Sequence, residues 1–454
     1  MKEHRFFESV VTQLLDSVNE RPNGDIMNPV KKEAMESNTK TVDYTKICED
    51  TYSIRYDYED LQMMNISRFA VTNLCKELKE YDLVISDSVY TTQPPSTNTI
   101  RIDYGVTAKV FEDVMLYSSL GVISGVYIKA QGIYRIEILG KNRECFEQLN
   151  SLYLLYLQNS NFYIGKCLKL MDDGTFDFMP LPNKTFEDVV LSNGTMDEYR
   201  NTAVDFLLNP RMQEICKKRR VILYGPPGTG KTSLISATFN YLSSNNITCI
   251  SLNEVGSLRG GLERTFNFIF KYLSPAFLVF EDIDLIGSDR NSGNSRLIGQ
   301  LLSIFDGVEE VNKALVFCST TNAFESLDRA FIRPCRIDRR YLLDYMTDKE
   351  MNTLFKKLLN VDLPKILSGQ KLTGAHIQEI SDTARLLASK ADDKDVKKYI
   401  DEAINIVMEH FCITKGKAVG FSIGEDDCRL NGISKLNMNR DEGMSAKDLI
   451  KEKR

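Results

Sequence analysis

A short loop in the middle of the chain has the composition of a phosphate-binding site. Residues 225–232 read Gly-Pro-Pro-Gly-Thr-Gly-Lys-Thr, which is the spacing Gly-x4-Gly-Lys-Thr. The apolar run 221–224 precedes this loop and Ser233-Leu234-Ile235 follows it, which predicts a buried strand leading into a helix. Small residues let backbone N–H groups curl around an anion, and the helix N-terminus adds a favourable dipole. We therefore predict that this loop binds a nucleoside triphosphate.

Two side chains of the loop have specific expected roles. Lys231 can reach the β- and γ-phosphates, and the Thr232 hydroxyl can ligate Mg²⁺, so ATP and Mg²⁺ are the expected cofactors. The alternative is a chance glycine-rich turn, but the four fixed positions would coincide in a chain this long only on the order of once per hundred sequences. The residues expected to contact ATP here are Gly225, Pro226, Pro227, Gly228, Thr229, Gly230, Lys231, Thr232 and Ser233.

Composition excludes several other classes of protein. A net charge of −6 provides no overall basic field for nucleic acid, although a local basic channel stays open as an alternative. Ten scattered cysteines without a C-x-x-C pair, with three histidines, predict neither a zinc site nor a disulfide framework. No apolar stretch reaches the ~20 residues of a transmembrane helix, so we expect a cytoplasmic protein without a membrane span.

The first residues have the pattern of an amphipathic helix. Between residues 3 and 20, the apolar positions recur at helical spacing: Phe6, Phe7, Val10, Val11, Leu14, Leu15 and Val18. Four acidic residues make this segment unlike a mitochondrial presequence: Glu3, Glu8, Asp16 and Glu20.

Residues 1–183 are expected to form an α+β recognition or assembly domain without a catalytic constellation. Helical patterns cover 58–82 and 143–158. Strand patterns occur at 100–104, 126–128 and 133–138, and a final pair at 162–171 and 175–179 is expected to complete this unit.

Residues 184–345 have the pattern of a parallel, doubly wound α/β domain. Strands are predicted at 221–224, 247–252, 277–280 and 314–318, alternating with helices. In such a sheet the ligand binds at the carboxyl ends of the strands. Residues 346–413 then predict a small helical lid, and 414–454 a polar, charged tail.

Polar residues follow two of the predicted strands. Glu281, Asp282 and Asp284 come after the third strand, and Asn322 comes after the fourth. ATP hydrolysis needs Mg²⁺ and a carboxylate that orients or deprotonates water, and an acidic pair beside a phosphate loop can supply both. The alternative is that these carboxylates cap the next helix. The Asn322 amide is suited to hold the attacking water.

These elements, with the run 327–338 (Leu-Asp-Arg-Ala-Phe-Ile-Arg-Pro-Cys-Arg-Ile-Asp), resemble the AAA ATPase family. The resemblance is good from residue 186 to about 345 and looser in the lid, where His376 stands in place of a usual Asp. Within the family, the motif Phe186-Glu187-Asp188-Val189 and the order Glu281-Asp282 are most similar to the branch of the mitochondrial Rieske-protein translocase. No membrane helix like that of this branch is apparent in the sequence.

The resemblance implies further roles. Glu281 takes the Mg²⁺ position with Thr232, Asp282 activates water, and Asn322 is the residue called sensor 1. Arg333 and Arg336 act as arginine fingers on a neighbouring subunit's nucleotide, which implies a ring, most often a hexamer; the alternative is a surface ion pair. Adenine is expected to contact four positions: Asp188, Val190, Gly374 and Ala375.

The sequence therefore predicts an AAA ATPase that hydrolyses Mg·ATP in a homo-oligomeric ring and remodels or translocates a macromolecular substrate, in the first instance a protein. The stretch 253–261 lacks the aromatic–hydrophobic–glycine triplet with which many family members grip a threaded polypeptide, so threading is not predicted. Two alternatives remain. One is a nucleic-acid motor or loader, and the other is an ATP-gated assembly switch with negligible turnover.

Overall fold

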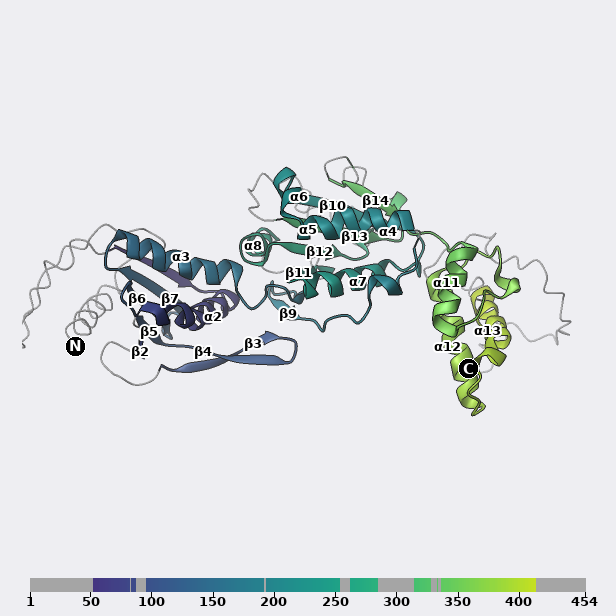
Figure 1. Ribbon diagram of the computed structural model, residues 1–454, viewed down its shortest axis with the longest axis horizontal. Helices are drawn as coiled ribbons and strands as arrows, with labels where there is room; N and C mark the ends of the chain where they lie inside the picture. Colours follow the sequence, from purple (N-terminus) through teal and green to yellow (C-terminus); the bar gives the residue numbers. More distant parts are fainter. Residues whose placement is uncertain are drawn as a thin grey trace, which may run out of the picture. The chain divides into compact units, whose positions relative to one another are not determined.

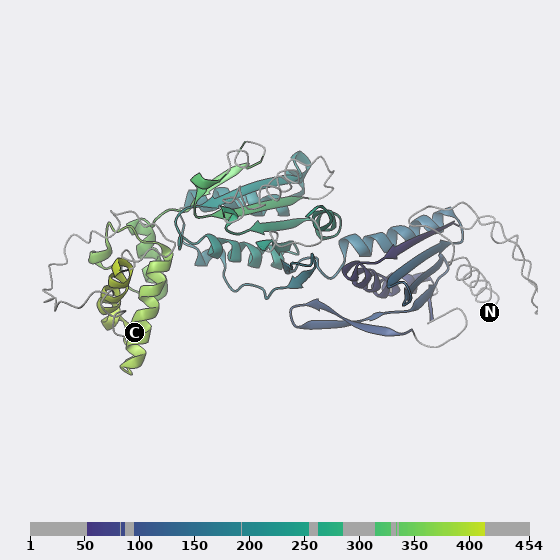
Figure 2. The same ribbon diagram turned by 180° about the vertical axis from the view of Figure 1, so that it is seen from behind.

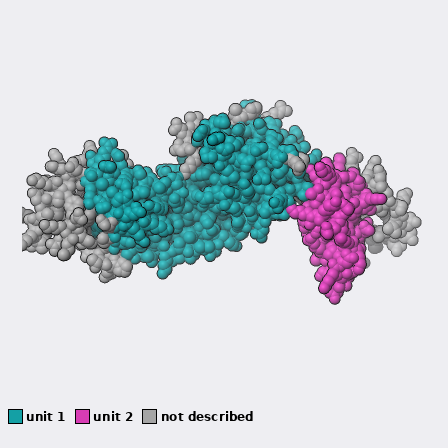
Figure 3. Space-filling model, in the orientation of Figure 1, with its two compact units in different colours: residues 1–344 teal, residues 345–454 magenta. Residues whose placement is uncertain are grey.

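The computed structural model describes residues 52–81, 83–86, 95–191, 193–253, 262–284, 314–327, 333 and 336–413. They belong to two compact units that divide after Asp344 (Figure 3). The predicted amphipathic segment 3–20, the tail 414–454 and residues 254–261 of the loop that lacks the triplet lie outside the described residues. Within the described ranges, none of the helices has the length and apolar character needed to cross a bilayer.

The first unit begins with an antiparallel sheet of five strands in the order β1-β7-β6-β5-β2. Its strands are β1 (Tyr52–Tyr58), β2 (Val84–Ser86), β5 (Val114–Tyr117), β6 (Gly121–Ile128) and β7 (Ile133–Gly140). The helices α2 (Leu61–Leu78) and α3 (Arg143–Asn159) pack against it, as the helical patterns predicted. A separate ribbon consists of β3 (Thr97–Asp103) and β4 (Val106–Phe111) (Figure 2).

Both helices begin at side-chain caps. The Asp60 carboxylate accepts hydrogen bonds from the first N–H groups of α2, and the Asn142 side chain accepts one from Cys145 in α3. These caps satisfy N–H groups that have no partner inside the helix.

The second sheet of the same unit, the seven-stranded sheet, has the strand order β14-β10-β13-β12-β11-β8-β9 (Figure 1). Its strands are β8 (Cys167–Leu170), β9 (Phe176–Phe178), β10 (Lys218–Tyr224), β11 (Thr248–Ser251), β12 (Ala276–Phe280), β13 (Leu315–Thr321) and β14 (Arg339–Leu342). All neighbouring pairs are parallel except β8 with β9. The prediction of a mainly parallel α/β sheet is confirmed.

Alternate side chains of this sheet enter two separate cores. Val221 and Leu223 of β10 face the core that contains α7 (Lys231–Ser244) and α5 (Asp205–Leu208). Ile222 faces the opposite core, which contains α8 (Leu262–Phe268) and the π-helix η6 (Ile269–Leu273). Burial on both faces explains why the central strands are continuous apolar runs.

The placement of the strand pair at 162–179 corrects the sequence analysis. We expected this pair to belong to the α+β domain of residues 1–183. Instead, β8 joins the seven-stranded sheet by pairing with β11, with Cys167 opposite Cys249. An alternating pattern identifies a strand but not its partner strand. The first strand is also shorter than expected, because Phe162 and Tyr163 lie in the preceding turn, with their rings 4.4 Å apart.

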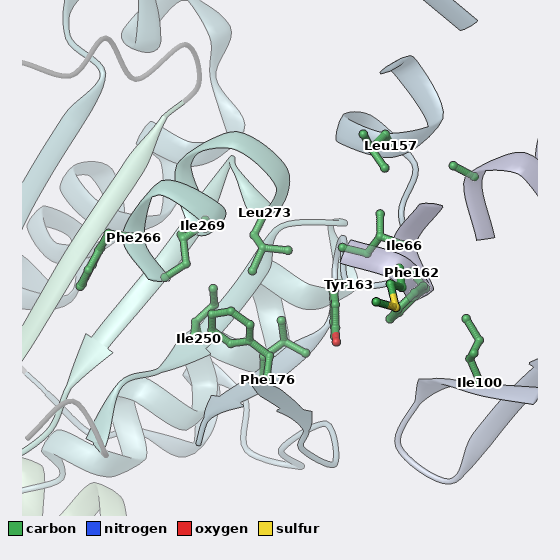
Figure 4. Close-up of a cluster of buried hydrophobic side chains, with 14 of the residues drawn as sticks. Ile66, Ile100, Leu157, Phe162, Tyr163, Phe176, Ile250, Phe266, Ile269 and Leu273 are labelled. Atoms are coloured by element: carbon green, nitrogen blue, oxygen red, sulfur yellow. The ribbon is translucent and has the colours of Figure 1, made fainter. Parts of the chain in front are cut away.

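A continuous core joins the N-terminal five-stranded sheet to the seven-stranded sheet. Figure 4 shows side chains from α2, α3, β9, β11, α8 and η6 in one cluster, including Ile66, Leu157, Tyr163, Phe176 and Leu273. The division of the first unit at residue 183 stays a prediction.

Polar contacts cross the same junction. The Gln62 amide donates to Gly174 O at 3.2 Å and accepts from Phe176 N at 3.1 Å. Asn161 donates to Tyr272 O at 2.8 Å. The side-chain amides of Gln62 and Asn161 are therefore paired in this junction.

The second unit is helical, as predicted. It contains α11 (Asp348–Leu359), α12 (Gly374–Lys390), the 3₁₀ turn η9 (Val396–Tyr399) and α13 (Ile400–Ile413). Buried side chains of the three α-helices, such as Phe355, Ile377 and Ile404, form its core. Its role as a lid stays a prediction.

The structure gives a local reason for His376. Its Nδ1 accepts the Thr373 N–H at 3.0 Å and lies 2.9 Å from the Thr373 hydroxyl, which forms a capping box at the start of α12. A carboxylate at this position would accept the same N–H. Nδ1 accepts only when the imidazole is neutral, and burial lowers the pKa of His376 from its usual 6.5.

This cap predicts a pH-dependent stability of the second unit. Because the folded pKa is lowered, the stabilisation is full above the unfolded pKa and is lost as the pH falls through the folded pKa. We expect the melting temperature of the helical unit to fall between pH 7.5 and 5.5, with a cap contribution of about 1 kcal/mol. His376→Asp should flatten this fall, because a carboxylate stays ionised over that range. Equal pH slopes in both proteins, measured by circular dichroism, would refute the cap.

Candidate nucleotide site

The predicted phosphate-binding loop lies between the end of β10 and the start of α7. Its glycines have backbone angles that favour glycine, with φ of +142° at Gly225, +78° at Gly228 and +99° at Gly230. A Cβ atom at Gly225 would lie 1.9 Å from the carbonyl oxygen of Leu343. Gly230 is the N-cap of α7. The strand–loop–helix context predicted from the sequence is therefore present.

Lys231 lies buried at the first position of α7 and folds back onto its own loop. Its Nζ donates to the carbonyl oxygens of Gly225 at 2.7 Å and Pro226 at 2.8 Å. Burial lowers the pKa of Lys231, while the negative charges of Asp282 and Asp284 raise it. A phosphate that enters the loop can replace the two carbonyl oxygens as the partner of this ammonium group.

The structure brings together Asp282 and Asn322, which follow two adjacent strands, β12 and β13. The Asn322 amide donates to Asp282 Oδ1 at 3.1 Å, and the Asp282 N–H donates to Thr320 Oγ1 at 2.9 Å. Asp282 has φ of +48°, a conformation that needs such support in a non-glycine residue. In the register of β10 with β13, Tyr224 lies opposite Thr321, so this pair lies beside the start of the phosphate loop.

Glu281 and Asp284 carry negative charge that the described contacts only partly offset. The Glu281 N–H donates to Asn253 Oδ1 at 3.2 Å. Burial and the adjacent Asp282 raise the pKa of Glu281. A buried carboxylate oxygen of Asp284, Oδ1, has no hydrogen-bond partner. A divalent cation would relieve both conditions.

These residues fit a Mg²⁺ ion. The donors are oxygen atoms, which Mg²⁺ prefers, and Thr232 is exposed in the first turn of α7. Among the described residues, no group of three or more His, Cys, Asp and Glu side chains is placed to hold a metal. A sparse protein shell is usual for Mg²⁺, which relies on water and substrate phosphates for its other ligands.

Three residues of the site were not identified from the sequence. Thr320 holds the Asp282 backbone, Asn253 holds the Glu281 backbone, and Lys184 Nζ donates to Ser233 Oγ at 2.9 Å. A polar residue inside an apolar strand, such as Thr320, is a signal that could have been used. The contact of Lys184 depends on tertiary structure and has no local signal.

Arg333 and Arg336 lie in a turn before β14. The N–H groups of Arg336 and Ile337 donate to Arg333 O at 3.0 and 3.1 Å. The turn is fixed to β10 by Asp338, whose N–H donates to Arg220 O and whose carboxylate accepts the Arg220 N–H, each at 2.8 Å. The Arg333 side chain is exposed and that of Arg336 is half-buried. Their role as arginine fingers stays a prediction.

The four expected adenine contacts are divided between the two units. Asp188 caps the turn η3 (Phe186–Asp188) by accepting from the Thr185 N–H at 2.8 Å, and Val190 follows this turn. Gly374 and Ala375 begin α12 of the second unit. Their contact with adenine stays a prediction.

Comparison with known proteins agrees with this geometry. Residues 221–345 match the family described as "ATPase family associated with various cellular activities (AAA)". The chain is 31% identical over 265 residues to the ATP-dependent zinc metalloprotease FtsH of Mycoplasmopsis synoviae, over 52% of this chain and 39% of that protein. It is 32% identical over 228 residues to the 26S proteasome regulatory subunit 4 homolog of Saccharomyces cerevisiae, over 46% of this chain and 52% of that protein.

A third relative extends further along this chain. The putative ribosome biogenesis ATPase nvl of Dictyostelium discoideum is 24% identical over 318 residues, which are 65% of this chain and 36% of that protein. The chain thus spans about half or less of the length of these curated relatives. The family match over residues 221–345 contains the phosphate loop, the acidic strand end and the arginine turn described above. Residues 221–345 of this chain are therefore an AAA-type P-loop ATPase domain.

Proposed function

We propose that this chain hydrolyses Mg·ATP within an oligomeric ring, as a hexamer by analogy with the family, and uses the energy to remodel or move a protein. The observation that carries the hydrolytic part is the placement of Asp282 and Asn322 beside the loop of Lys231. A binding-only switch would need no carboxylate held in this way. A cytoplasmic location belongs to the same proposal.

Each proposed role follows from the charge and hydrogen bonds of the residue. Lys231 binds the β- and γ-phosphates, and the loop N–H groups surround them. Thr232 and Glu281 hold Mg²⁺, which neutralises phosphate charge when bound. Asp282 orients or deprotonates the attacking water, and the Asn322 amide holds the Asp282 carboxylate and that water.

The order Glu281-Asp282 has a consequence for rate. Asp is one methylene shorter than Glu, so the Asp282 carboxylate must lie closer to the γ-phosphate or act through a second water. A general base works within about 2.6–3.2 Å of its proton, or through one water. We therefore propose a slow intrinsic turnover.

Relatives support a protein substrate. One is named as a metalloprotease and another as a regulatory subunit of the proteasome, and both names refer to work on proteins. The net charge of −6 adds no support for nucleic acid. If DNA or RNA stimulated ATPase activity in a salt-sensitive manner, a nucleic-acid motor would replace the present proposal.

Magnesium titration of phosphate release tests the two acidic roles. Wild type should release phosphate from ATP in a steady state. Asp282→Asn should bind ATP normally but lose hydrolysis at every Mg²⁺ concentration, because it lacks the base. Glu281→Gln should need more Mg²⁺ and recover when it is supplied. Rescue of Asp282→Asn by Mg²⁺, with Glu281→Gln inactive throughout, would reverse the assignments. Absent turnover by wild type would favour the assembly switch.

Mixed subunits test whether arginine acts across an interface. Arg336→Ala should retain ATP binding, but its rate of hydrolysis should fall by a factor of roughly 10³–10⁵, which is the contribution of an arginine finger to kcat. Mixing it with Lys231→Ala should restore some activity, since a few interfaces then combine an intact loop with an intact arginine. The matched control is Arg143→Ala, which removes an exposed arginine of α3 and should change nothing. Without recovery in rings confirmed to be mixed, action in trans is rejected.

A further inference from the structure

The N-terminal sheet has two faces, and only one belongs to the described cores. On the first face, Tyr134, Ile136 and Ile138 of β7 join the hydrophobic cluster that contains α2 and α3. Side chains alternate along a strand, so their neighbours Arg135, Glu137 and Leu139 face the other way. The second face is therefore the side of the sheet away from α2 and α3.

Apolar side chains on this second face are buried. Met115, Tyr117, Val122 and Leu139 are only 2%, 5%, 1% and 7% exposed. None of them belongs to the hydrophobic clusters that the described residues form. Strand register places Tyr117, Val122 and Leu139 in one row across β5, β6 and β7. These four residues define what we call the outer patch.

Charged side chains beside the outer patch are buried or half-buried. Asp57 accepts two hydrogen bonds from Arg135, at 2.7 and 3.1 Å, and lies 3.4 Å from Arg55. Glu137, opposite Arg55 in the register of β1 with β7, is 8% exposed. Whatever covers this face must bring apolar surface for the outer patch.

We propose that the N-terminal segment 3–20 of the same chain covers the outer patch as an amphipathic helix. Its seven apolar residues, Phe6 to Val18, form one stripe at helical spacing. From Phe6 to Val18 the stripe covers 13 residues, about 20 Å of helix, and five strands span about 20 Å, so the stripe matches the width of the sheet. Residues 21–51 lie between this segment and β1, and a chain of that length can span at most on the order of 100 Å, so the sequence is long enough for the segment to reach this face.

The charge of segment 3–20 favours binding to the sheet over binding to a lipid surface. The segment contains Glu3, Glu8, Asp16 and Glu20 against Arg5, a net charge of −3 from these five residues (−4 + 1). Helices that lie on anionic membranes are rich in Lys and Arg on their polar face. The acidic face of this segment therefore suits water, while its apolar stripe faces the sheet.

Oxidative footprinting of the full chain tests the proposal. Hydroxyl radicals oxidise exposed methionine sulfur, so Met115 reports directly on the cover of the outer patch. Leu14→Asp places a charge at the centre of the apolar stripe and should raise Met115 oxidation several-fold. Thr12→Asp adds the same charge on the polar side of the helix and should leave Met115 protected. Met351, in the core of the second unit, should stay protected in all proteins.

The outcomes separate the proposed cover from its rivals. If Met115 is oxidised in wild type, or stays protected in Leu14→Asp, the segment does not cover this face. Protection that depends on protein concentration and not on Leu14 would assign the patch to a second copy of the chain. The milder Leu14→Ser should give the same rise with a normal melting transition, so misfolding of Leu14→Asp cannot imitate the result.

Discussion

The buried positive charge of Lys231 is the constraint on which the nucleotide site depends. An ammonium group is costly to bury unless it is paired and hydrogen-bonded. Here two carbonyl oxygens of the loop accept hydrogen bonds from the ammonium group, and Asp282 and Asp284 supply negative charge nearby. This arrangement requires a loop that curls back on itself, which the left-handed glycines Gly228 and Gly230 permit. The site is thus held in a form in which phosphate oxygens can take the place of carbonyl oxygens.

Sheet register brings the other groups to this charge. The strands β10, β12 and β13 are adjacent and parallel, so their carboxyl ends lie at one edge. Thr320, still inside β13, holds the backbone of Asp282 at the end of β12, and Asn322 holds its carboxylate. The strained backbone of Asp282 is therefore supported from the neighbouring strand. The order of the strands therefore places Asp282 and Asn322 beside the phosphate loop.

Sequence patterns predicted the parts whose signals are local. The phosphate loop, the four central strands and the helical unit were all expected, because each depends on residues within a short window. The partner of β8 was not predicted, since pairing joins residues such as Cys167 and Cys249 that are far apart in the chain. The strand β14 was missed because Arg339 and Arg340 hide its pattern. Lys184 acquires its role only through a tertiary contact, whereas Thr320 is marked locally as a polar residue inside an apolar strand.

The central claim is that Lys231 exchanges its loop carbonyls for ATP phosphates, and ATP affinity of Lys231→Ala tests it most directly. Calorimetric titration should show affinity reduced by about 10-fold to 100-fold or more, the value of charge-assisted hydrogen bonds. The control Lys218→Ala, at the opposite end of β10, should bind like wild type. If Lys231→Ala bound ATP as tightly as wild type, the assignment of this loop to the phosphates would be wrong.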